Sequence, residues 1–405
     1  MRLLYLAGVD LSLPLGHATH VRRLTEALER RGHQVRVVAR QAARPLPWPG
    51  PSGGLVFSRA WSLPKLRHLT AELSSARALR REIADFAPEI LLVREETLTF
   101  APLLLRRPVR PPLVVESNGP VPEIAAANGA SPLRVRLLRI LEGRVLRAGD
   151  TVGAVTARLA AFQARVHGLD ASRVFVVPNG AWVPSLIGND ADALRRARRV
   201  EDGEFLLAFA GNLNAMQGLE VLLQALARIQ DPNIRFWIIG KAPGGRRLER
   251  LADSLGLLPR VQFLGGMEEE MAVRHLQAAQ AVVAPYRREA HEAVCGEGLK
   301  VLQGLAADRP LLVSRLPGIE FLEGNEALAW VEQDSPEAWA EAVVRLQREW
   351  IRAGCPRQGW PWREGEGPGR RFIERHRTWD RTAEAWEIVF AAARRLREPG
   401  GRPGT

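Results

Sequence analysis

Lysine is rare in this sequence, and its three positions are the first candidates for binding an anionic ligand. The 405-residue chain has 57 Lys and Arg residues, of which only Lys65, Lys241 and Lys300 are lysine. A lysine ammonium is a compact point charge that the planar fork of arginine does not reproduce at a tight phosphate site. We therefore expect Lys241 and Lys300 to bind phosphate. Codon bias is the alternative explanation for the three lysine positions, and a solvated turn residue is the alternative role for Lys241.

Glycine-containing loops supply a second set of candidates, because they follow apolar runs and precede helical patterns. Ligands of open parallel sheets bind at the carboxyl ends of the strands, where helix N-termini attract phosphate. The candidate residues in these loops are Gly16, Asn212, Gln217, Gly240, Lys241, Glu297, Gly298, Leu299 and Lys300. A tight turn is the structural alternative for each loop. None matches a dinucleotide fingerprint or a Walker motif, which disfavours nicotinamide cofactors and Walker-type ATP binding.

The elements that must position these residues alternate between strands and helices. Strands are expected over 2–8, 34–39, 90–93, 112–116 and 150–155, and again over 204–210, 234–239, 261–264, 281–284 and 310–314. Such alternation predicts an α/β fold with two doubly wound parallel sheets. We expect one Rossmann-like domain over 1–185, a second over 186–370, a terminal helix over 371–397 and a disordered tail over 398–405.

Composition excludes several classes of protein. The chain is 46% hydrophobic and 25% charged, which is too apolar for disorder. Cys295 and Cys355 are the only cysteines, so neither a disulfide framework nor a structural zinc site is supported. No apolar run approaches the roughly 18 to 20 residues of a membrane span. We expect a cytoplasmic protein that is soluble or attached to a membrane surface.

The ordered set of motifs resembles the retaining glycosyltransferases of the GT-B fold, in the large family four. The matching segments are Gly16 with His20-Val21-x-x-Leu24, Arg31 to Val35, Val176-Val177-Pro178-Asn179-Gly180, Phe263-Leu264-Gly265-Gly266 and, more loosely, Phe372 to Asp380. The resemblance covers nearly the whole chain. It implies two domains that face each other across a cleft, with the terminal helix crossing back to the first domain.

The resemblance also implies a reaction and its substrates. The second domain would bind a nucleotide-diphosphate sugar as donor, the first domain would bind the acceptor, and no metal or other cofactor is expected. Breaking the anomeric bond places negative charge on the leaving diphosphate, which fixed cations and N–H donors stabilise. Lys300, at the start of a helix, is the expected catalytic cation. The donor residues would be those of the glycine loops, together with Gln303, which would also take part in catalysis.

Two departures from the family pattern bear on activity. The common pair of glutamates is replaced in register by Cys295 and Gln303, while Glu289 and Glu297 have the right mutual spacing six residues early. The usual Arg and Lys after the first strand of the donor domain are replaced by amides. One interpretation is an inactive protein. The other, which we favour, is similarity to active members that transfer amino or deoxy sugars in O-antigen and capsule assembly, where Gln303 would donate and accept hydrogen bonds.

Candidate residues of the first domain follow its strands and precede its first helix. Glu116 would bind the acceptor or stabilise positive charge in the transition state, and a carboxylate that caps a turn is the alternative. Asn118 lies two residues further on in the same loop. His17 and His20 would also bind the acceptor, unless they merely cap or pack the helix.

The net charge of +12 is concentrated in the first domain. Residues 1–185 hold 26 basic and 14 acidic residues, whereas residues 186–405 hold 31 of each. The segment 131–147 interleaves five arginines with Leu, Val and Ile, a pattern typical of a helix that reaches an anionic membrane. An ordinary helix with a solvated basic face is the alternative. We expect a lipid-linked or saccharide acceptor in cell-surface polysaccharide or glycolipid assembly, and a peripheral location on the inner membrane face.

A non-enzymatic protein is the competing hypothesis. It would be a catalytically silent scaffold of this fold or a basic protein that binds nucleic acid or membrane. No nucleic-acid-binding motif supports such a partner, so no nucleic acid is expected.

Overall fold

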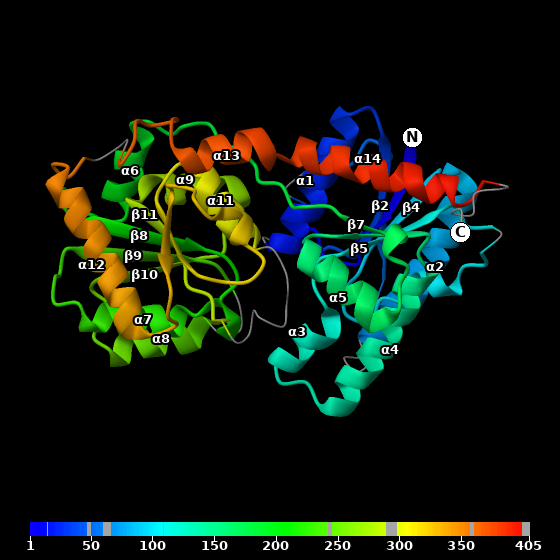
Figure 1. The fold of residues 1–405 in the computed structure, drawn as a ribbon, viewed down its shortest axis with the longest axis horizontal. Coiled ribbons are helices and arrows are strands. Elements are labelled where there is room, and N and C mark those ends of the chain that lie inside the picture. The colour runs from blue at the N-terminus through cyan, green and yellow to red at the C-terminus, as the bar shows by residue number, and fades with distance from the viewer. Residues whose placement is uncertain are drawn as a thin grey trace.

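The computed structural model describes residues 1–13, 15–46, 50–59, 66–107, 109–241, 245–288, 298–356 and 360–398. Two α/β domains lie side by side, each with a parallel sheet between helices (Figure 1). The predicted fold class is confirmed. The predicted boundary at residue 185 falls in the connection between the last strand of the first sheet and the first helix of the second domain.

The first domain contains a seven-stranded sheet in the order β3-β2-β1-β4-β5-β6-β7. Its strands are β1 (Arg2–Leu6), β2 (Gln34–Arg40), β3 (Leu55–Ser58), β4 (Ile90–Arg94), β5 (Leu113–Ser117), β6 (Thr151–Ala154) and β7 (Val174–Val176). Its helices are α1 (Gly16–Arg30), α2 (Arg67–Phe86), α3 (Val121–Ala127), α4 (Pro132–Ala148) and α5 (Ala157–His167). Helices cover both faces, so the central strands are continuous apolar runs.

The second domain contains a six-stranded sheet in the order β10-β9-β8-β11-β12-β13. Its strands are β8 (Phe205–Ala210), β9 (Ile234–Ile239), β10 (Val261–Gly265), β11 (Ala281–Ala284), β12 (Leu311–Ser314) and β13 (Leu328–Val331). Its helices are α6 (Asp190–Ala197), α7 (Leu219–Arg228), α8 (Gly245–Ser254), α9 (Glu269–Ala278), α11 (Leu299–Ala306) and α12 (Pro336–Arg352). Two buried apolar clusters cover the faces of this sheet.

Three strands were not predicted from the sequence: β3, β7 and β13. Each has only three or four residues and lies at an edge of its sheet. An edge strand is covered less completely than a central one, and its hydrophobic pattern is correspondingly weak. The ten predicted strands match the other ten.

The expected single helix over 371–397 consists of two helices, α13 (Pro368–His376) and α14 (Trp379–Arg395). The hydroxyl of Thr378 accepts a hydrogen bond from the Arg381 N–H and caps α14. The interdomain connection passes at this break, where the Ala181 N–H donates to the Arg377 carbonyl oxygen at 2.7 Å. The helix α14 then contacts α1, β5 and β6, so the predicted return of the chain to the first domain is confirmed (Figure 1).

Candidate functional site

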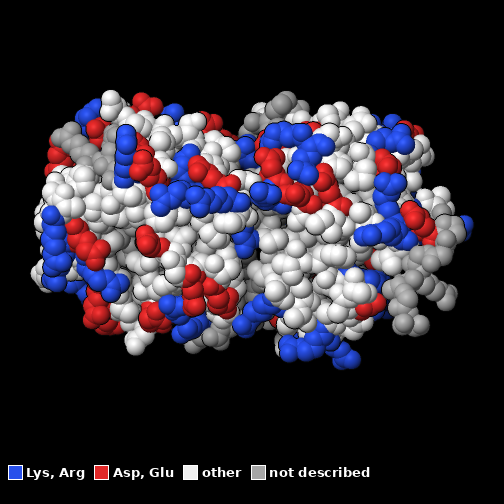
Figure 2. Space-filling model, turned by 45° about the horizontal axis from the view of Figure 1, so that its top comes forward, with Lys and Arg blue, Asp and Glu red and all other residues white. Residues whose placement is uncertain are grey.

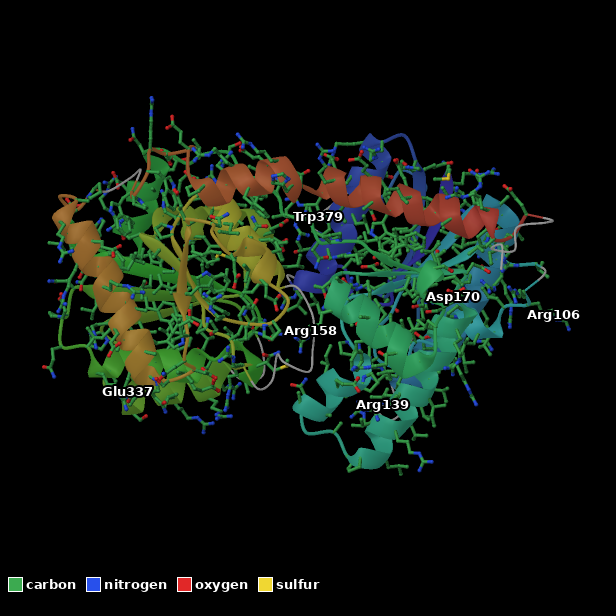
Figure 3. The ribbon with its side chains drawn as sticks, viewed as in Figure 1. Arg106, Arg139, Arg158, Asp170, Glu337 and Trp379 are labelled. Atoms are coloured by element: carbon green, nitrogen blue, oxygen red, sulfur yellow. The ribbon has the colours of Figure 1, made fainter. Side chains whose placement is uncertain are left out.

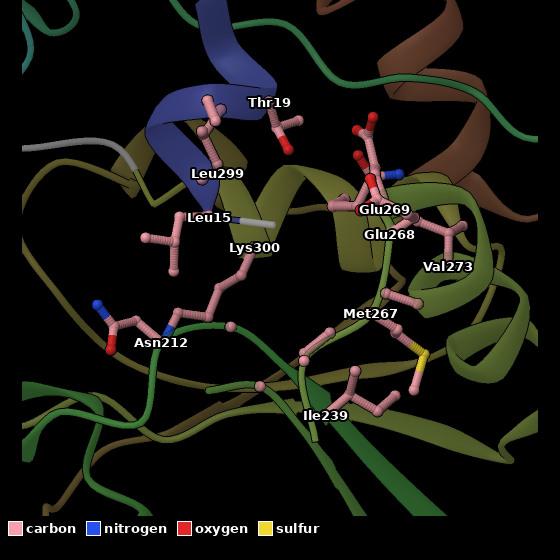
Figure 4. Close-up of a pocket in the computed structure, with 18 of the residues that line it drawn as sticks. Leu15, Thr19, Asn212, Ile239, Met267, Glu268, Glu269, Val273, Leu299 and Lys300 are labelled. Atoms are coloured by element: carbon pink, nitrogen blue, oxygen red, sulfur yellow. The ribbon is translucent and has the colours of Figure 1, made fainter. Parts of the chain in front are cut away.

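A cavity of about 210 Å³ lies between the two domains. One wall is formed by the loop after β1 and the first turns of α1, including Leu15, Gly16 and His17. The opposite wall is formed by the residues after β8, β9 and β10 and by the first turn of α11 (Figure 4). The carboxyl ends of parallel strands from both domains therefore meet at this cavity, where the fold is expected to bind its ligand.

Two glycines allow the loops after β8 and β9 to lie against each other. A Cβ atom at Gly240 would overlap the carbonyl oxygen of Gly211. Both residues line the cavity, together with Asn212 and Lys241, whose side chains are exposed. The close approach leaves the backbone of both loops accessible to a ligand.

Lys300 extends from α11 across the cavity towards the loop that carries Asn212 (Figure 4). Its Nζ atom is buried and has no hydrogen-bond partner among the described residues. The ammonium instead lies 4.0 Å from the ring centroid of Tyr286 and 4.7 Å from that of Phe209. Burial lowers the pKa of Lys300 well below its usual value. An anion in the cavity would supply the partner that this side chain lacks.

Two helix N-termini also face this cavity. Leu15 precedes α1 and Gly298 precedes α11, and neither residue caps its helix through a side chain. The two first turns lie close together, since a Cβ atom at Gly16 would lie 3.8 Å from Leu299 Cδ1. The free N–H groups and the positive dipole ends of both helices therefore add to the charge of Lys300 in attracting phosphate.

The cavity brings together most of the predicted donor residues: Gly16, Asn212, Gly240, Lys241, Leu299, Lys300 and Gln303. Gln303 also donates from Nε2 to the carbonyl oxygen of Trp182 at 2.9 Å, which ties α11 to the interdomain connection.

Three predicted donor residues are not among the described residues that line the cavity. Gln217 lies in a short 3₁₀ helix, η3 (Ala215–Gln217), and its buried Oε1 has no hydrogen-bond partner among the described residues. Gly298 directly precedes α11, and a Cβ atom there would overlap the hydroxyl of Tyr286. Glu297 lies outside the described residues, as do Glu289 and Cys295.

Glu116 is a fully buried carboxylate at the end of β5, behind the cavity wall. Its Oε1 accepts hydrogen bonds from Arg94 Nη1 at 2.8 Å and Asn118 Nδ2 at 2.6 Å, and it lies 2.6 Å from His20 Nε2. The hydroxyl of Tyr5 donates to Oε2. Burial alone would raise the pKa of Glu116, but the charges of His20 and Arg94 hold it far below its usual value. With 0% of its surface exposed, Glu116 is not accessible to a substrate in this arrangement.

The three predicted acceptor residues are separated in the structure. His17 lines the interdomain cavity, and burial lowers its pKa. His20 is buried, 5.0 Å from the ring of Trp379 in an edge-to-face arrangement. Asn118 lines a second cavity of about 490 Å³ at the ends of β4 and β5, together with Arg94 and other residues.

Several residues of these sites were missed from the sequence. Glu269 lines the interdomain cavity and accepts from Arg22 at 2.7 Å and Arg23 at 2.8 Å, which joins the first turn of α9 to α1. Trp379, at the start of α14, lines the same cavity and lies between the domains (Figure 3). No local pattern indicates either contact. Arg94 directly follows the apolar run of β4, and this position alone would have made it a candidate.

Two further features are absent from the described residues. None of their helices has both the length and the apolar character needed to cross a membrane. No group of three or more His, Cys, Asp or Glu side chains in the same part of the chain is arranged to hold a metal ion.

Two Rossmann-like domains with an anion-attracting cavity between them define the GT-B class of protein. The family comparisons are consistent with this class: residues 16–180 match the glycosyl transferase 4-like domain, and residues 204–349 match the glycosyl transferases group 1. The chain therefore belongs to glycosyltransferase family four, a retaining GT-B family.

A curated relative and two solved structures illustrate the similarity. The D-inositol 3-phosphate glycosyltransferase of Geodermatophilus obscurus is 27% identical over 267 residues, which are 62% of this chain and 54% of the relative. The chain thus matches about half the length of that relative. Sucrose-phosphate synthase from Thermosynechococcus elongatus has a TM-score of 0.78 at 20% identity, covering 97% of this chain and 100% of that one. Anabaena HepE in complex with UDP-glucose has a TM-score of 0.69 at 16% identity, covering 96% and 100%.

Proposed function

We propose that this protein transfers a sugar from a nucleotide-diphosphate sugar to an acceptor with retention of anomeric configuration. The observation that carries this proposal is the buried Nζ atom of Lys300, which has no hydrogen-bond partner among the described residues, in a side chain that lines the same cavity as the starts of two helices. Burying an ammonium group without a partner is costly, and a bound anion would remove that cost. A diphosphate carries the opposite charge and several acceptor oxygens.

We assign separate tasks to the chain's residues. Lys300 and the N–H groups at the starts of α1 and α11 stabilise the negative charge that grows on the leaving diphosphate. The exposed amide of Asn212 and the side chain of Gln303 bind neutral groups of the donor. The two domains enclose the cavity from opposite sides, so water is displaced when the donor binds.

Glu116 has a positioning role in this proposal. It holds Arg94 and Asn118 at the wall of the second cavity and His20 against Trp379. His17 lies on the acceptor side of the interdomain cavity and contacts the incoming substrate. The position of both residues near the carboxyl ends of the first sheet supports these roles.

The donor and acceptor classes rest on different observations. Amides in place of charges at Asn212 and Gln217 support an amino or deoxy sugar, and the similarity to a structure that contains UDP-glucose supports a uridine nucleotide. The excess of arginine in the first domain supports an acidic acceptor, such as a lipid-linked saccharide in surface-polysaccharide or glycolipid assembly at the inner membrane face.

A thermal-shift screen with UDP, GDP and dTDP sugars tests the proposal. We expect at least one nucleotide sugar to raise the melting temperature, because a ligand that binds only the folded state stabilises it. Turnover of that sugar should be lost in Lys300→Ala while the circular dichroism spectrum is unchanged. Full turnover in this variant would contradict the role of Lys300, and no stabilisation by any of these sugars would favour a silent scaffold or a basic binding protein.

A further inference from the structure

The second cavity, of about 490 Å³, is lined by a buried carboxyl group that lacks a partner. Glu95 directly follows β4, and only 6% of its surface is exposed. Neither of its carboxyl oxygens has a hydrogen-bond partner among the described residues. Burial, and then the charge of Glu142, raise the pKa of Glu95 well above its usual value. The hydroxyl of Ser117 opposes this shift but does not reach hydrogen-bond geometry with either oxygen.

The other buried carboxylates described in the first domain all have partners. Their partners are backbone N–H groups, arginines or histidines, and the residues are Glu72, Glu82, Glu116, Glu142 and Asp150. Less buried carboxylates are paired as well on the face that carries α1 and α14, where acidic and basic side chains are intermixed (Figure 2) and Arg31 Nη2 lies 2.7 Å from Glu387 Oε2. An unpaired buried carboxyl is costly, and a ligand with hydrogen-bond donors would remove that cost at Glu95.

The lining of the second cavity combines both signs of charge with an apolar wall. Arg94 donates from Nε to Glu96 Oε1 at 2.8 Å, and both side chains line the cavity with Glu95. The apolar lining residues belong to α3 and are Val121, Ile124 and Ala125. A phosphate would share this cavity with an unpaired carboxyl, and an ammonium group would share it with Arg94 and Arg134. A neutral ring with hydroxyl groups on its rim and C–H groups on its faces matches the lining better than either ion.

We propose that the second cavity binds a neutral polyol ring of the acceptor, and that Glu95 hydrogen-bonds two neighbouring hydroxyl groups of this ring. A carboxyl group accepts through both oxygens when it is ionised and also donates when it is protonated, and a pair of hydroxyls can meet either form. Thr97 and Asn118 line the same cavity and offer polar groups to further hydroxyls. Glu95 is then a specificity-determining residue, because a ring without paired hydroxyls leaves its carboxyl group unpartnered.

The second cavity lies next to the donor site. The loop after β1 lines the interdomain cavity at Leu13, and a Cβ atom at Gly8 of the same loop would lie 3.7 Å from Glu96 Cγ. Asn128, at the end of α3, places its Nδ2 atom 3.9 Å from Met216 Sδ of the donor domain. Figure 1 likewise shows α3 on the side of the first domain that faces the second. A ring in the second cavity would therefore present a further hydroxyl to the donor, a consequence that rests on the proposed function, whereas polyol binding itself does not.

Saturation-transfer NMR of the full chain without nucleotide tests the proposal. Sugars and cyclitols share the required hydroxyl pattern, so the probes are methyl glucoside, methyl mannoside, methyl galactoside and myo-inositol. Cyclohexanol is the control ring, because it carries a single hydroxyl group. We expect at least one polyol to bind and cyclohexanol not to bind. Glu95→Leu should weaken polyol binding by about ten-fold or more, because two hydrogen bonds are lost, and Glu95→Gln should bind with intermediate affinity.

The melting temperature distinguishes a binding role of Glu95 from a structural one. Because its carboxyl group is buried without a partner, Glu95→Leu should raise the melting temperature of the free protein. Glu82→Leu is the matched control, since it removes a buried carboxylate that pairs with Arg36 at 2.6 Å and does not line the cavity. This control should lower the melting temperature and leave polyol binding unchanged.

The proposal is overturned by several results: no polyol binding in the original chain, equal binding of cyclohexanol, unchanged polyol binding in Glu95→Leu, or a lower melting temperature in that variant. Thermal shift with nucleotide sugars separates this proposal from the proposed function. Stabilisation by a nucleotide sugar without any polyol binding contradicts the polyol site alone. Polyol binding that depends on Glu95, without stabilisation by any nucleotide sugar, contradicts the proposed function alone.

Discussion

Lys300→Met tests the donor site most sharply, because it removes a charge while keeping a long apolar side chain. The Nζ atom is buried with no hydrogen-bond partner among the described residues, so an anion in the cavity would gain a charge-assisted hydrogen bond. Such a bond contributes about 1.5 to 3 kcal/mol. We therefore expect the dissociation constant of the nucleoside diphosphate to rise by roughly 10- to 150-fold.

The same substitution should raise the stability of the free protein. Burial lowers the pKa of Lys300 well below its usual value of 10.5, which shows that the buried charge is unfavourable before a ligand binds. In the unfolded chain the Lys300 amine keeps its proton up to about its usual pKa of 10.5. The loss of folding stability caused by burying this charge is therefore complete below the lowered pKa of the folded state, and it disappears as pH rises from that pKa to 10.5. The stability advantage of Lys300→Met should accordingly shrink as pH rises through this window.

Titration calorimetry with UDP and scanning calorimetry without ligand measure the two effects. Lys241→Met is the matched control, because Lys241 lines the same cavity but is exposed. An exposed charge contributes about 0 to 1 kcal/mol, so this variant should lose roughly five-fold or less in affinity. Unchanged UDP affinity in Lys300→Met, or a fall in its unliganded melting temperature, would refute the reasoning.

Three further substitutions test neighbouring features. Gly240→Ala should separate the loops after β8 and β9, because the added Cβ overlaps the Gly211 carbonyl oxygen, and thermal shift should show weaker stabilisation by UDP. Glu116→Gln should cost about 3 kcal/mol in urea unfolding by leaving Arg94 without its buried charge partner. Because the pKa of Glu116 is lowered in the folded state, the original chain should lose this stability as pH falls below about 4.5, and the variant should not. Glu269→Ala should release two arginines of α1 and increase the radius of gyration measured by X-ray scattering, and an unchanged value would exclude a clamping role.

The sequence by itself determined the central strands, the two-domain order and the loops that carry the donor site. Strands buried on both faces are continuous apolar runs, and Gly240, Lys241 and Lys300 follow such runs or begin the next helix. Local patterns of this kind are sufficient because the carboxyl ends of parallel strands meet at one edge. Of the four edge strands, β10 left such a pattern, whereas β3, β7 and β13, which have only three or four residues, did not.

Only the tertiary structure decided which side chains meet and how deeply each is buried. Glu116 and Asn118 are two residues apart, yet the former is buried among Tyr5, His20 and Arg94 while the latter lines a cavity. The burial of Lys300 Nζ between two aromatic rings likewise depends on Phe209 of β8 and on Tyr286, which follows β11. The excess of arginine is visible in the composition. Which arginines form ion pairs and which are exposed on α4 depends on packing. Contacts between distant segments set burial, and burial sets charge state and access, so neither follows from spacing alone.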